Sequence, residues 1–242
     1  MSLEPINLSA SLSGTTTATS TQEVPSVGTS DLVKPSRPEV GAVAYHGSKR
    51  ATDIILCVGG LVVFWPVMGA IALAIKIDSR GPVLFRQSRP GLDGKPFNCL
   101  KFRTMIADAE ALLQDHPELI NEFSQNGKIR HDPRVTRMGH FLRKTSLDEL
   151  PQILNILYGQ MTLVGPRPIV WSQEEQYGEY LSKLYSVKPG LAGLWQVEGR
   201  SETTMEERIA LDMKYVDSRS LRGDMKLLLR TLRAVIQRKG AY

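Results

Sequence analysis

The sequence predicts a mostly helical α+β fold, held at a membrane as a monotopic protein by one proline-kinked, re-entrant apolar helix. Three observations predict it: an uncharged apolar stretch, two short strand patterns directly after it, and helical periodicity over most of the remaining chain. The 242 residues are 42% hydrophobic and 23% charged, which is enough for one ordinary domain with a buried core.

Cysteine content and charge narrow the class of protein. Cys57 and Cys99 form no CxxC pair and no Cys/His ligand spacing, which excludes a cystine-stapled secreted module and a structural zinc site. A reducing compartment fits this usage. The net charge of +5 and the pI of about 9.2 are compatible with nucleic acid, anionic lipid or phosphorylated substrates, and the excess is too small to choose among them.

Composition divides the chain into three segments. Residues 1–45 are dominated by Ser, Thr, Gly and Pro and are expected to form a disordered tail. This tail has no basic region followed by an apolar core, so it does not read as a secretory signal and is expected to stay in the cytoplasm. A membrane helix is expected over 46–80 and a cytoplasmic domain over 81–242.

The stretch from Ile54 to Ile75 contains no charged residue. At about 1.5 Å per residue, a helix of this length spans roughly 33 Å, and the hydrocarbon core of a bilayer is about 30 Å thick. We therefore predict a membrane segment. The alternative is a buried core helix, although such helices are usually shorter or carry a polar face.

Two features indicate that this segment re-enters the membrane rather than crossing it. Basic residues stand on both sides, at 49–50 and at 76–89, and the positive-inside rule draws both ends to the cytoplasmic face. Pro66 lies near the middle and cannot donate a backbone hydrogen bond, which predicts a kink, and Trp65 beside it suits an interfacial depth. A tilted, kinked single span is the alternative.

Beyond the segment, two strand patterns joined by the turn signal Asp93-Gly94 predict a hairpin within 81–105. Helical patterns follow at 104–114, after Pro117, and at 148–158, 171–186, 203–217 and 224–238. The last of these is amphipathic: one face carries Met225, Leu228, Leu229, Leu232, Val235 and Ile236, and the other carries Lys226, Arg230, Arg233 and Gln237. Such a helix packs on a core or lies in an anionic membrane interface.

The adjacent carboxylates Asp148 and Glu149 are candidates for chemistry. One interpretation is structural, because Ser146 and Glu149 have the spacing of a helix capping box. In the other, a phosphate binds at the start of the helix with help from Arg143 and Lys144. One carboxylate would then attack phosphorus, and its neighbour would bind a hard cation such as Mg²⁺.

A second candidate element is the Gly165–Pro168 string GPRP. Two prolines stiffen the backbone around Arg167, which suits bidentate binding of a phosphate or carboxylate, although a surface turn with a solvated arginine has the same pattern. The alternation at Lys101, Phe102 and Arg103 is typical of a half-buried strand. No GxGxxG, GxxxxGK[ST], GxSxG or HExxH motif occurs, which gives no support for a Rossmann cofactor site, a P-loop, a hydrolase nucleophile elbow or a zinc protease.

Long strings in the chain, taken in order, resemble the bacterial sugar transferase family. These are the monotopic polyprenyl-phosphate phosphoglycosyl transferases, and the resemblance is to their ExoY-like, exopolysaccharide-initiating members. The strings are KRATD, GPVLFRQSRPGLDGKPFNCLKFRTM, DPRVTRMGHFLRKTSLDELPQILNIL, MTLVGPRP and KPGLAGLWQVEGR, and the resemblance runs from Lys49 to Tyr242. Two positions depart from the family pattern: Arg219 stands where many members have Trp, and Trp65-Pro66 where relatives often have Ser-Pro.

The resemblance implies transfer of a sugar 1-phosphate from a UDP-sugar to undecaprenyl phosphate, with release of UMP. It implies that Asp148 attacks the phosphorus attached to the sugar and forms a covalent intermediate, and that Glu149 binds Mg²⁺. The family's motifs give Arg143 and Arg167 as phosphate ligands. They also give Gln196 and Arg200 in a loop on the substrate side. Lys101 and Arg103, on the predicted strand, are two further candidate substrate-binding residues.

The same resemblance implies a place and partners. A catalytic domain would lie on the cytoplasmic face of the bacterial inner membrane, contact membrane lipid, and supply downstream glycosyltransferases; a homodimer stays open, and nucleic acid is not expected. UDP-galactose and UDP-glucose are the leading donors, with N-acetylated sugars open. The alternative functions are a metal-dependent phosphohydrolase acting on a phosphorylated lipid, and a tethered nucleic-acid or anionic-lipid binder using 128–144 and 226–239.

Overall fold

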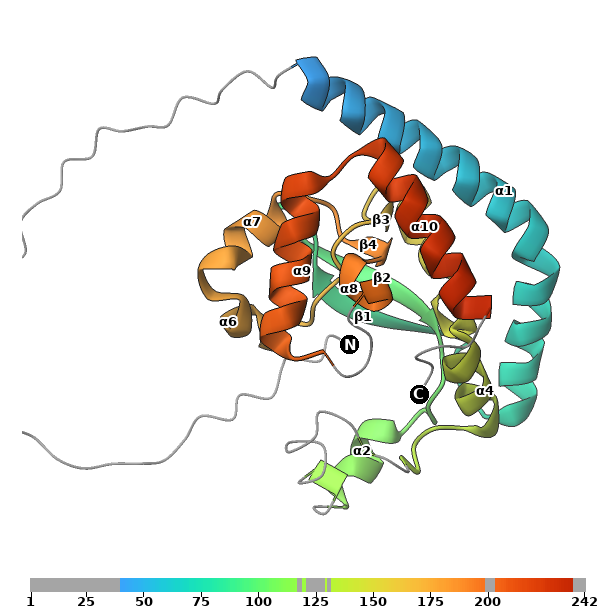
Figure 1. Cartoon of the computed structure of the whole chain (residues 1–242). Coiled ribbons are helices and arrows are strands. Elements are labelled where there is room, and N and C mark those ends of the chain that lie inside the picture. The colour runs from blue at the N-terminus through green and yellow to red at the C-terminus, as the bar shows by residue number, and fades with distance from the viewer. Residues whose placement is uncertain (1–39, 117–118, 121–128, 130–131, 199–202, 237–242) are drawn as a thin grey trace, which may run out of the picture. The chain divides into compact units, whose positions relative to one another are not determined.

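The computed structural model describes residues 40–116, 119–120, 129, 132–198 and 203–236 (Figure 1). Most of the tail predicted over 1–45 and the end of the helix predicted over 224–238 lie outside these residues, as does Arg200. Within them, the prediction of a mostly helical α+β fold with one long apolar helix and small sheets is confirmed.

Helix α1 runs over Val40–Asp78, 39 residues with Pro66 inside it. It begins before the boundary expected at residue 46. Figure 1 shows it as one curved helix along a side of the domain. Among the described residues it is the one helix whose length and apolar composition are enough to cross a membrane. Its apolar side chains are mostly exposed, Trp65 at 66%, so the alternative of a buried core helix is disfavoured.

The predicted hairpin is confirmed. Strand β1 (Leu84–Pro90) pairs antiparallel with β2 (Pro96–Phe102). The turn between them contains the 3₁₀ segment η1 (Leu92–Gly94), where Asp93 and Gly94 have φ of 57° and 69°. Both values lie in the left-handed region, which Asp tolerates and Gly adopts freely, so the Asp-Gly signal marks this turn for a steric reason.

A second sheet was not predicted. Strand β3 (Thr162–Val164) pairs in parallel with β4 (Gly190–Ala192). Three residues are too few to show a strand periodicity, so the sequence pattern could not predict these strands. The two strands approach closely: a Cβ added at Gly190 would lie 2.1 Å from the backbone nitrogen of Gly165.

The helical patterns are confirmed in part. The pattern at 171–186 is broken into four short pieces rather than one helix, and the basic region before residue 145 contains a helix that was not predicted. The elements after β2 are α2 (Ala109–Gln114), α4 (Arg137–Thr145), η2 (Leu147–Glu149), α5 (Gln152–Leu157), η3 (Trp171–Gln173), α6 (Glu174–Tyr177), η4 (Gly178–Tyr180), α7 (Leu181–Tyr185), α8 (Leu194–Glu198), α9 (Met205–Ser218) and α10 (Leu221–Ile236).

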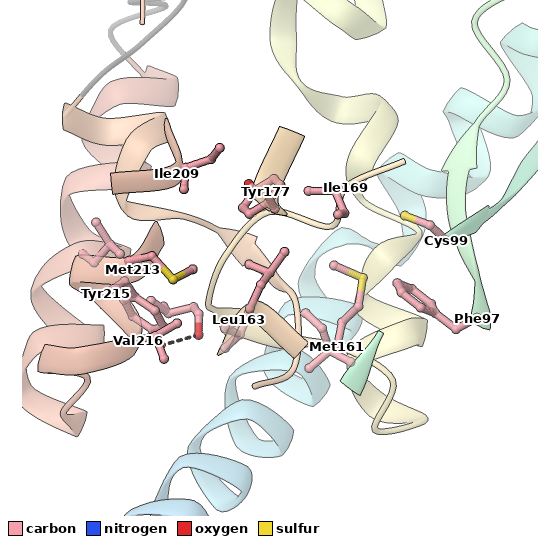
Figure 2. Packing of buried hydrophobic residues seen from close by; sticks show 14 of the residues in the cluster. Phe97, Cys99, Met161, Leu163, Ile169, Tyr177, Ile209, Met213, Tyr215 and Val216 are labelled. Atoms are coloured by element: carbon pink, nitrogen blue, oxygen red, sulfur yellow. Dashed lines mark hydrogen bonds between the residues drawn. The ribbon is translucent and has the colours of Figure 1, made fainter. Parts of the chain in front are cut away.

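The main core lies between α9, β3 and the hairpin. Figure 2 shows Ile209, Met213 and Val216 of α9 facing Leu163, with Phe97 on the far side of the cluster. A second, smaller cluster joins α1 to the rest of the domain through Ile71, Ile75, Phe102 and Leu142. Because Cys57 of α1 belongs to the main core, both halves of α1 pack on the same domain.

Candidate active site

Three chain segments converge on the Asp148–Glu149 pair. The pair lies on η2, between α4 and α5, and η2 packs against the end of β2. Lys101 comes from β2, Arg143 from the last turn of α4, and Arg167 from the loop after β3. Tertiary folding thus brings together five of the charged residues that the sequence singled out: Lys101, Arg143, Asp148, Glu149 and Arg167.

The capping-box interpretation of Ser146 and Glu149 is wrong. Ser146 has a φ of 56°, and its side chain caps no helix. Its backbone N–H instead bonds to the carbonyls of Leu142 and Arg143, which ends α4. The left-handed residue turns the chain so that Glu149 faces inward rather than back along a helix. The six-residue helix α5 then begins at Gln152, later than expected, with Pro151 as its N-cap.

Glu149 is held by two cations. Arg167 Nη2 lies 2.5 Å and Lys101 Nζ 2.8 Å from its Oε1, and Arg167 Nη1 lies 3.3 Å from Oε2. Burial favours the neutral acid, but the charges of Arg167 and Lys101 outweigh it and hold the pKa of Glu149 far below its usual range. The same carboxylate is the main cause of the raised pKa of Arg167.

Asp148 has a different environment from its neighbour. Among the described residues, no hydrogen bond or ion pair engages its carboxylate. Burial raises its pKa above the usual value, against the opposing charge of Lys101. A carboxylate that is free of partners and made more basic by burial, with cations around it, has the properties of a nucleophile toward phosphorus.

Arg143 is anchored so that part of its guanidinium is left free. Its Nε donates to Thr104 Oγ1 at 3.0 Å, and no contact among the described residues engages its other nitrogens. Helix α4 can come this close because Gly139 packs on Thr104: a Cβ at Gly139 would lie 1.9 Å from the Thr104 carbonyl oxygen. Arg143 and Asp148 are close enough that each affects the pKa of the other.

Two predicted substrate residues have local roles in the structure. Arg103 is buried, and its guanidinium donates to the carbonyls of Arg80 and Ser79 at 2.5 and 2.8 Å, which ties the end of α1 to the hairpin. It is therefore not brought to the Asp148–Glu149 pair. Gln196 Oε1 accepts from the N–H of Gly193 at 2.7 Å and so shapes the loop before α8.

Two polar residues near the site were missed by the sequence analysis. Asn155 is buried and pairs with the edge of β2, accepting from Leu100 N–H at 2.9 Å and donating to the Asn98 carbonyl at 2.7 Å. Arg89 donates to the carbonyl of Pro168, at the end of the loop that carries Arg167. Both lie inside the long strings that resemble the family, and nothing in their spacing marks them.

The charged residues of the KRATD string bind protein backbone. Lys49 Nζ donates to the Val164 carbonyl at 2.8 Å. Arg50 donates to the carbonyls of Ile156 and Leu157 at 2.6 and 2.8 Å, which satisfies the end of α5.

Asp53 completes this contact. It accepts from Thr162 Oγ1 at 2.6 Å and from Leu163 N–H at 3.1 Å. In the sequence, the basic pair 49–50 indicated on which side of the membrane the helix begins. In the structure the string attaches the start of the apolar helix to β3 and α5.

The donor set at the site suits a hard cation only in part. No group of three His, Cys, Asp or Glu side chains within the described residues can hold a metal ion. Asp148 and Glu149 nevertheless supply adjacent carboxylates, and Glu149 Oε2 has one long hydrogen bond, at 3.3 Å. Mg²⁺ is commonly bound by one or two carboxylates together with substrate phosphates and water, and this pair fits that pattern.

The chain is similar in sequence to known proteins. A family model described as bacterial sugar transferase matches residues 44–238. The exopolysaccharide production protein ExoY of Rhizobium meliloti is 39% identical over 210 residues, which cover 84% of this chain and 93% of that protein. The UDP-galactose-lipid carrier transferase of Erwinia amylovora is 39% identical over 83% of this chain, and the UDP-glucose:undecaprenyl-phosphate glucose-1-phosphate transferase of Escherichia coli K12 is 42% identical over 80%.

The length of these relatives differs. The chain spans 43% of the Erwinia protein and 41% of the E. coli protein, and nearly all of ExoY. The matched region contains most of α1, the Asp148–Glu149 pair and the loop of Arg167 together. On the extent of the match and the identity to ExoY, the chain belongs to the bacterial sugar transferase family.

Proposed function

We propose that this protein transfers a sugar 1-phosphate from a UDP-sugar to undecaprenyl phosphate through a covalent aspartyl intermediate, and so initiates exopolysaccharide synthesis. The observation that carries the proposal is the contrast within one acidic pair. Asp148 is half-buried, desolvation raises its pKa, and no described residue hydrogen-bonds to its carboxylate, while Glu149 pairs with Lys101 and Arg167.

The chemistry requires two displacements at one phosphorus atom. A carboxylate oxygen of Asp148 attacks the phosphorus attached to the sugar, the bond to the UMP oxygen breaks, and UMP leaves with that electron pair. An oxygen of undecaprenyl phosphate then attacks the same phosphorus and displaces Asp148. Lys101, Arg143 and Arg167 surround Asp148 and would stabilise the negative charge that develops on the phosphoryl oxygens.

We include Mg²⁺ as the cofactor, with Glu149 as its protein ligand and Asp148 adjacent. A bound Mg²⁺ neutralises charge on the diphosphate of the donor. Because Glu149 pairs with Lys101 and Arg167 in the structure, its oxygens become more available when those cations move onto the phosphates of the substrate.

Galactose and glucose are the proposed sugars. The names of the Erwinia and E. coli relatives specify UDP-galactose and UDP-glucose respectively, and a Salmonella typhimurium relative, 39% identical over 80% of this chain, is an undecaprenyl-phosphate galactose phosphotransferase. The relative ExoY, whose length this chain matches, carries exopolysaccharide production in its name.

We further propose that α1 re-enters the cytoplasmic face of the inner membrane. Support comes from its two ends, which bind the same domain: Lys49 holds Val164 near the start, and Arg103 holds Ser79 and Arg80 at the finish. A helix that crossed the bilayer would place one of these ends on the opposite side from the domain. The uncharged segment between the ends exposes its apolar side chains.

Two other helices offer apolar side chains for the same surface. Leu229 and Leu232 of α10 are 67% and 53% exposed, and Phe141 of α4 is 50% exposed. The opposite side of α10 packs inward through Leu227. An amphipathic helix with exposed leucines and basic neighbours is suited to an anionic lipid interface, and we propose that α4 and α10 lie there.

UMP release by detergent-solubilised protein tests the reaction. The assay contains Mg²⁺, undecaprenyl phosphate and a panel of UDP-sugars, with Asp148→Asn as the test variant and Asp217→Asn, an exposed aspartate, as the matched control. Release that follows one sugar, needs the lipid acceptor for sustained turnover and is lost only in Asp148→Asn supports the proposal. Sustained phosphate or UMP release without acceptor would instead support the phosphohydrolase.

Cysteine labelling tests the topology. Native Cys57 and Cys99 are 1% exposed, so background labelling is expected to be low. Ser48→Cys and Arg80→Cys place exposed thiols before and after the apolar segment. Labelling of both from inside-out vesicles and of neither from intact spheroplasts supports re-entry, and labelling from opposite sides would show a span.

A further inference from the structure

The carbonyl of Val164 receives two donors from distant parts of the chain. Lys49 Nζ of α1 and the Tyr215 hydroxyl of α9 each lie 2.8 Å from this oxygen. Val164 is the last residue of β3, directly before the loop that carries Arg167. The backbone that leads into the site is therefore held by the membrane helix and by a core helix at one atom.

Both donors are themselves fixed by one buried carboxylate. Asp224 of α10 is 3% exposed and accepts from Lys49 at 2.5 Å and from Tyr45 at 3.0 Å. The Tyr215 hydroxyl lies 2.9 Å from it and shares its single proton between Asp224 and the Val164 carbonyl. A buried charge is tolerated only when it is paired and hydrogen-bonded, and these contacts satisfy Asp224. The cluster of Lys49, Tyr215 and Asp224 thus joins α1, β3, α9 and α10 at the Val164 carbonyl.

The backbone between Val164 and Arg167 is held rigidly, so the position of Val164 determines the position of Arg167. Gly165 N–H bonds to the Ala192 carbonyl at 3.0 Å, and Gly190 N–H bonds to the Pro166 carbonyl at 2.7 Å. Two prolines flank Arg167 and restrict the backbone. A displacement of Val164 therefore moves the backbone of Arg167 rather than being absorbed in the loop.

We infer that the Lys49–Tyr215–Asp224 cluster is a positioning device for Arg167. The cluster sets the distance of the Arg167 guanidinium from the Asp148–Glu149 pair. Because Lys49 belongs to α1, this distance depends on the position of α1 relative to the domain. The residues act through Arg167 and do not touch substrate. The inference rests on the proposed function only for its kinetic readout.

A double-mutant cycle tests the kinetic readout. Tyr215→Phe removes the hydroxyl and keeps the ring, and it is measured in the wild-type and Arg167→Lys backgrounds. We expect about tenfold slower UMP release in the first background and less than about twofold in the second, because the effects of two substitutions are non-additive when one residue acts through the other. Equal factors in the two backgrounds would overturn the inference and leave the proposed transfer intact.

Tyr177→Phe is the matched control. Tyr177 also donates from a buried position to a buried carboxylate, Asp212, at 2.9 Å, and within the described residues it makes no hydrogen bond to Val164. Its effect on UMP release is expected to be the same factor in both backgrounds. Should Tyr215→Phe fail to fold, Asp224→Asn replaces it in the cycle, since it removes the charge that orients Lys49.

Hydrogen exchange gives a readout that does not depend on activity. In Tyr215→Phe, the peptide covering 162–170 should exchange faster by about tenfold, and in Tyr177→Phe it should match wild type. Unchanged exchange in Tyr215→Phe overturns the positioning role even if the protein released no UMP. Absence of UMP release from wild-type protein would refute the proposed function alone.

Discussion

Arg167 and Glu149 form a two-pronged ion pair, with Nη2 2.5 Å from Oε1 and Nη1 3.3 Å from Oε2. Lys101 shares Oε1 at 2.8 Å, so a single carboxylate holds two cations, one from strand β2 and one from the loop after β3. Glu149 therefore organises the positive charge that faces Asp148. Its first role is to keep Lys101 and Arg167 in place when no phosphate is bound.

Replacing Glu149 by Gln should reduce UMP release by at least about 100-fold, because the amide leaves both cations unpaired and free to move. Glu198→Gln is the control, since Glu198 also bridges two cations, Lys214 at 3.6 Å and Arg230 at 3.0 Å, away from the site. Steady-state kinetics of both variants provide the measurement. Equal activity of the two variants would show that Glu149 has no special role.

Glu149 should also make the protein sensitive to acid. Its pKa is lowered on folding, so its contribution to stability is complete above the unfolded value of about 4.3 and is lost as the pH falls toward the folded value. Wild-type protein should lose thermal stability below about pH 4.3 more steeply than Glu149→Gln. Thermal denaturation in detergent between pH 3 and pH 7 measures this, and parallel curves would contradict it.

Lys101 and Arg103 should behave differently although both were predicted to bind substrate. Lys101→Met removes a cation beside Glu149 and should lower UMP release by roughly 100-fold with a small change in melting temperature. Arg103→Met removes the donors that tie the end of α1 to the hairpin and should instead lower the melting temperature by several degrees. Kinetics and thermal denaturation of both proteins distinguish the roles, and the reverse pattern would return Arg103 to the site.

Asn155 should be important for stability, because its side chain makes the backbone hydrogen bonds that a neighbouring strand would make along β2. Asn155→Leu leaves Leu100 N–H and the Asn98 carbonyl without partners and should cost about 2–4 kcal/mol of stability. It should also lower activity, since it frees the strand that presents Lys101. Gln160→Leu is the control: Gln160 accepts from Asn155 at 2.7 Å and does not bond to β2. Denaturant unfolding and UMP release should single out Asn155→Leu.

Gly139 should not tolerate a side chain. In Gly139→Ala the new Cβ would meet the Thr104 carbonyl oxygen at 1.9 Å, which forces α4 and Arg143 away from the site. We expect a loss of about 1–3 kcal/mol together with lower activity. Gly47→Ala is the control, because that helical position has nothing within 4 Å and should gain up to about 1 kcal/mol. Thermal denaturation compares the two, and equal stability would refute the packing argument.

Asp212 should make the protein less stable at high pH. Burial raises its pKa from 3.8 to about 7, and the Tyr177 hydroxyl opposes this, while Asp212 Oδ1 has no partner among the described residues. The raised pKa means that stability is present below the ordinary value and is lost as the pH rises through about 7. Asp212→Asn should therefore exceed wild type in melting temperature at pH 8 and match it near pH 4; a constant difference would contradict the titration.

The residue types within short segments were sufficient to predict several features of the structure. The absence of charge from Ile54 to Ile75 determines an apolar helix, because a run of that length has no polar face to solvate. Asp93-Gly94 determines the hairpin turn, because its backbone needs positive φ. The Asp148–Glu149 pair and Arg167 were identified from residue type and stiff neighbouring backbone, and the structure brings them together.

Other features depend on contacts between segments far apart in the chain, which no local pattern records. The sequence allowed Glu149 to cap a helix, whereas in the fold the left-handed Ser146 and the packing against β2 and the Arg167 loop place it beside Lys101 and Arg167. Arg103 carries the same charge as Lys101 and follows it by two residues. Its guanidinium nevertheless donates to the carbonyls of Ser79 and Arg80, at the end of α1. Hydrogen bonds and ion pairs act only over a few ångströms, so the tertiary structure decided which of the equivalent charges face Asp148.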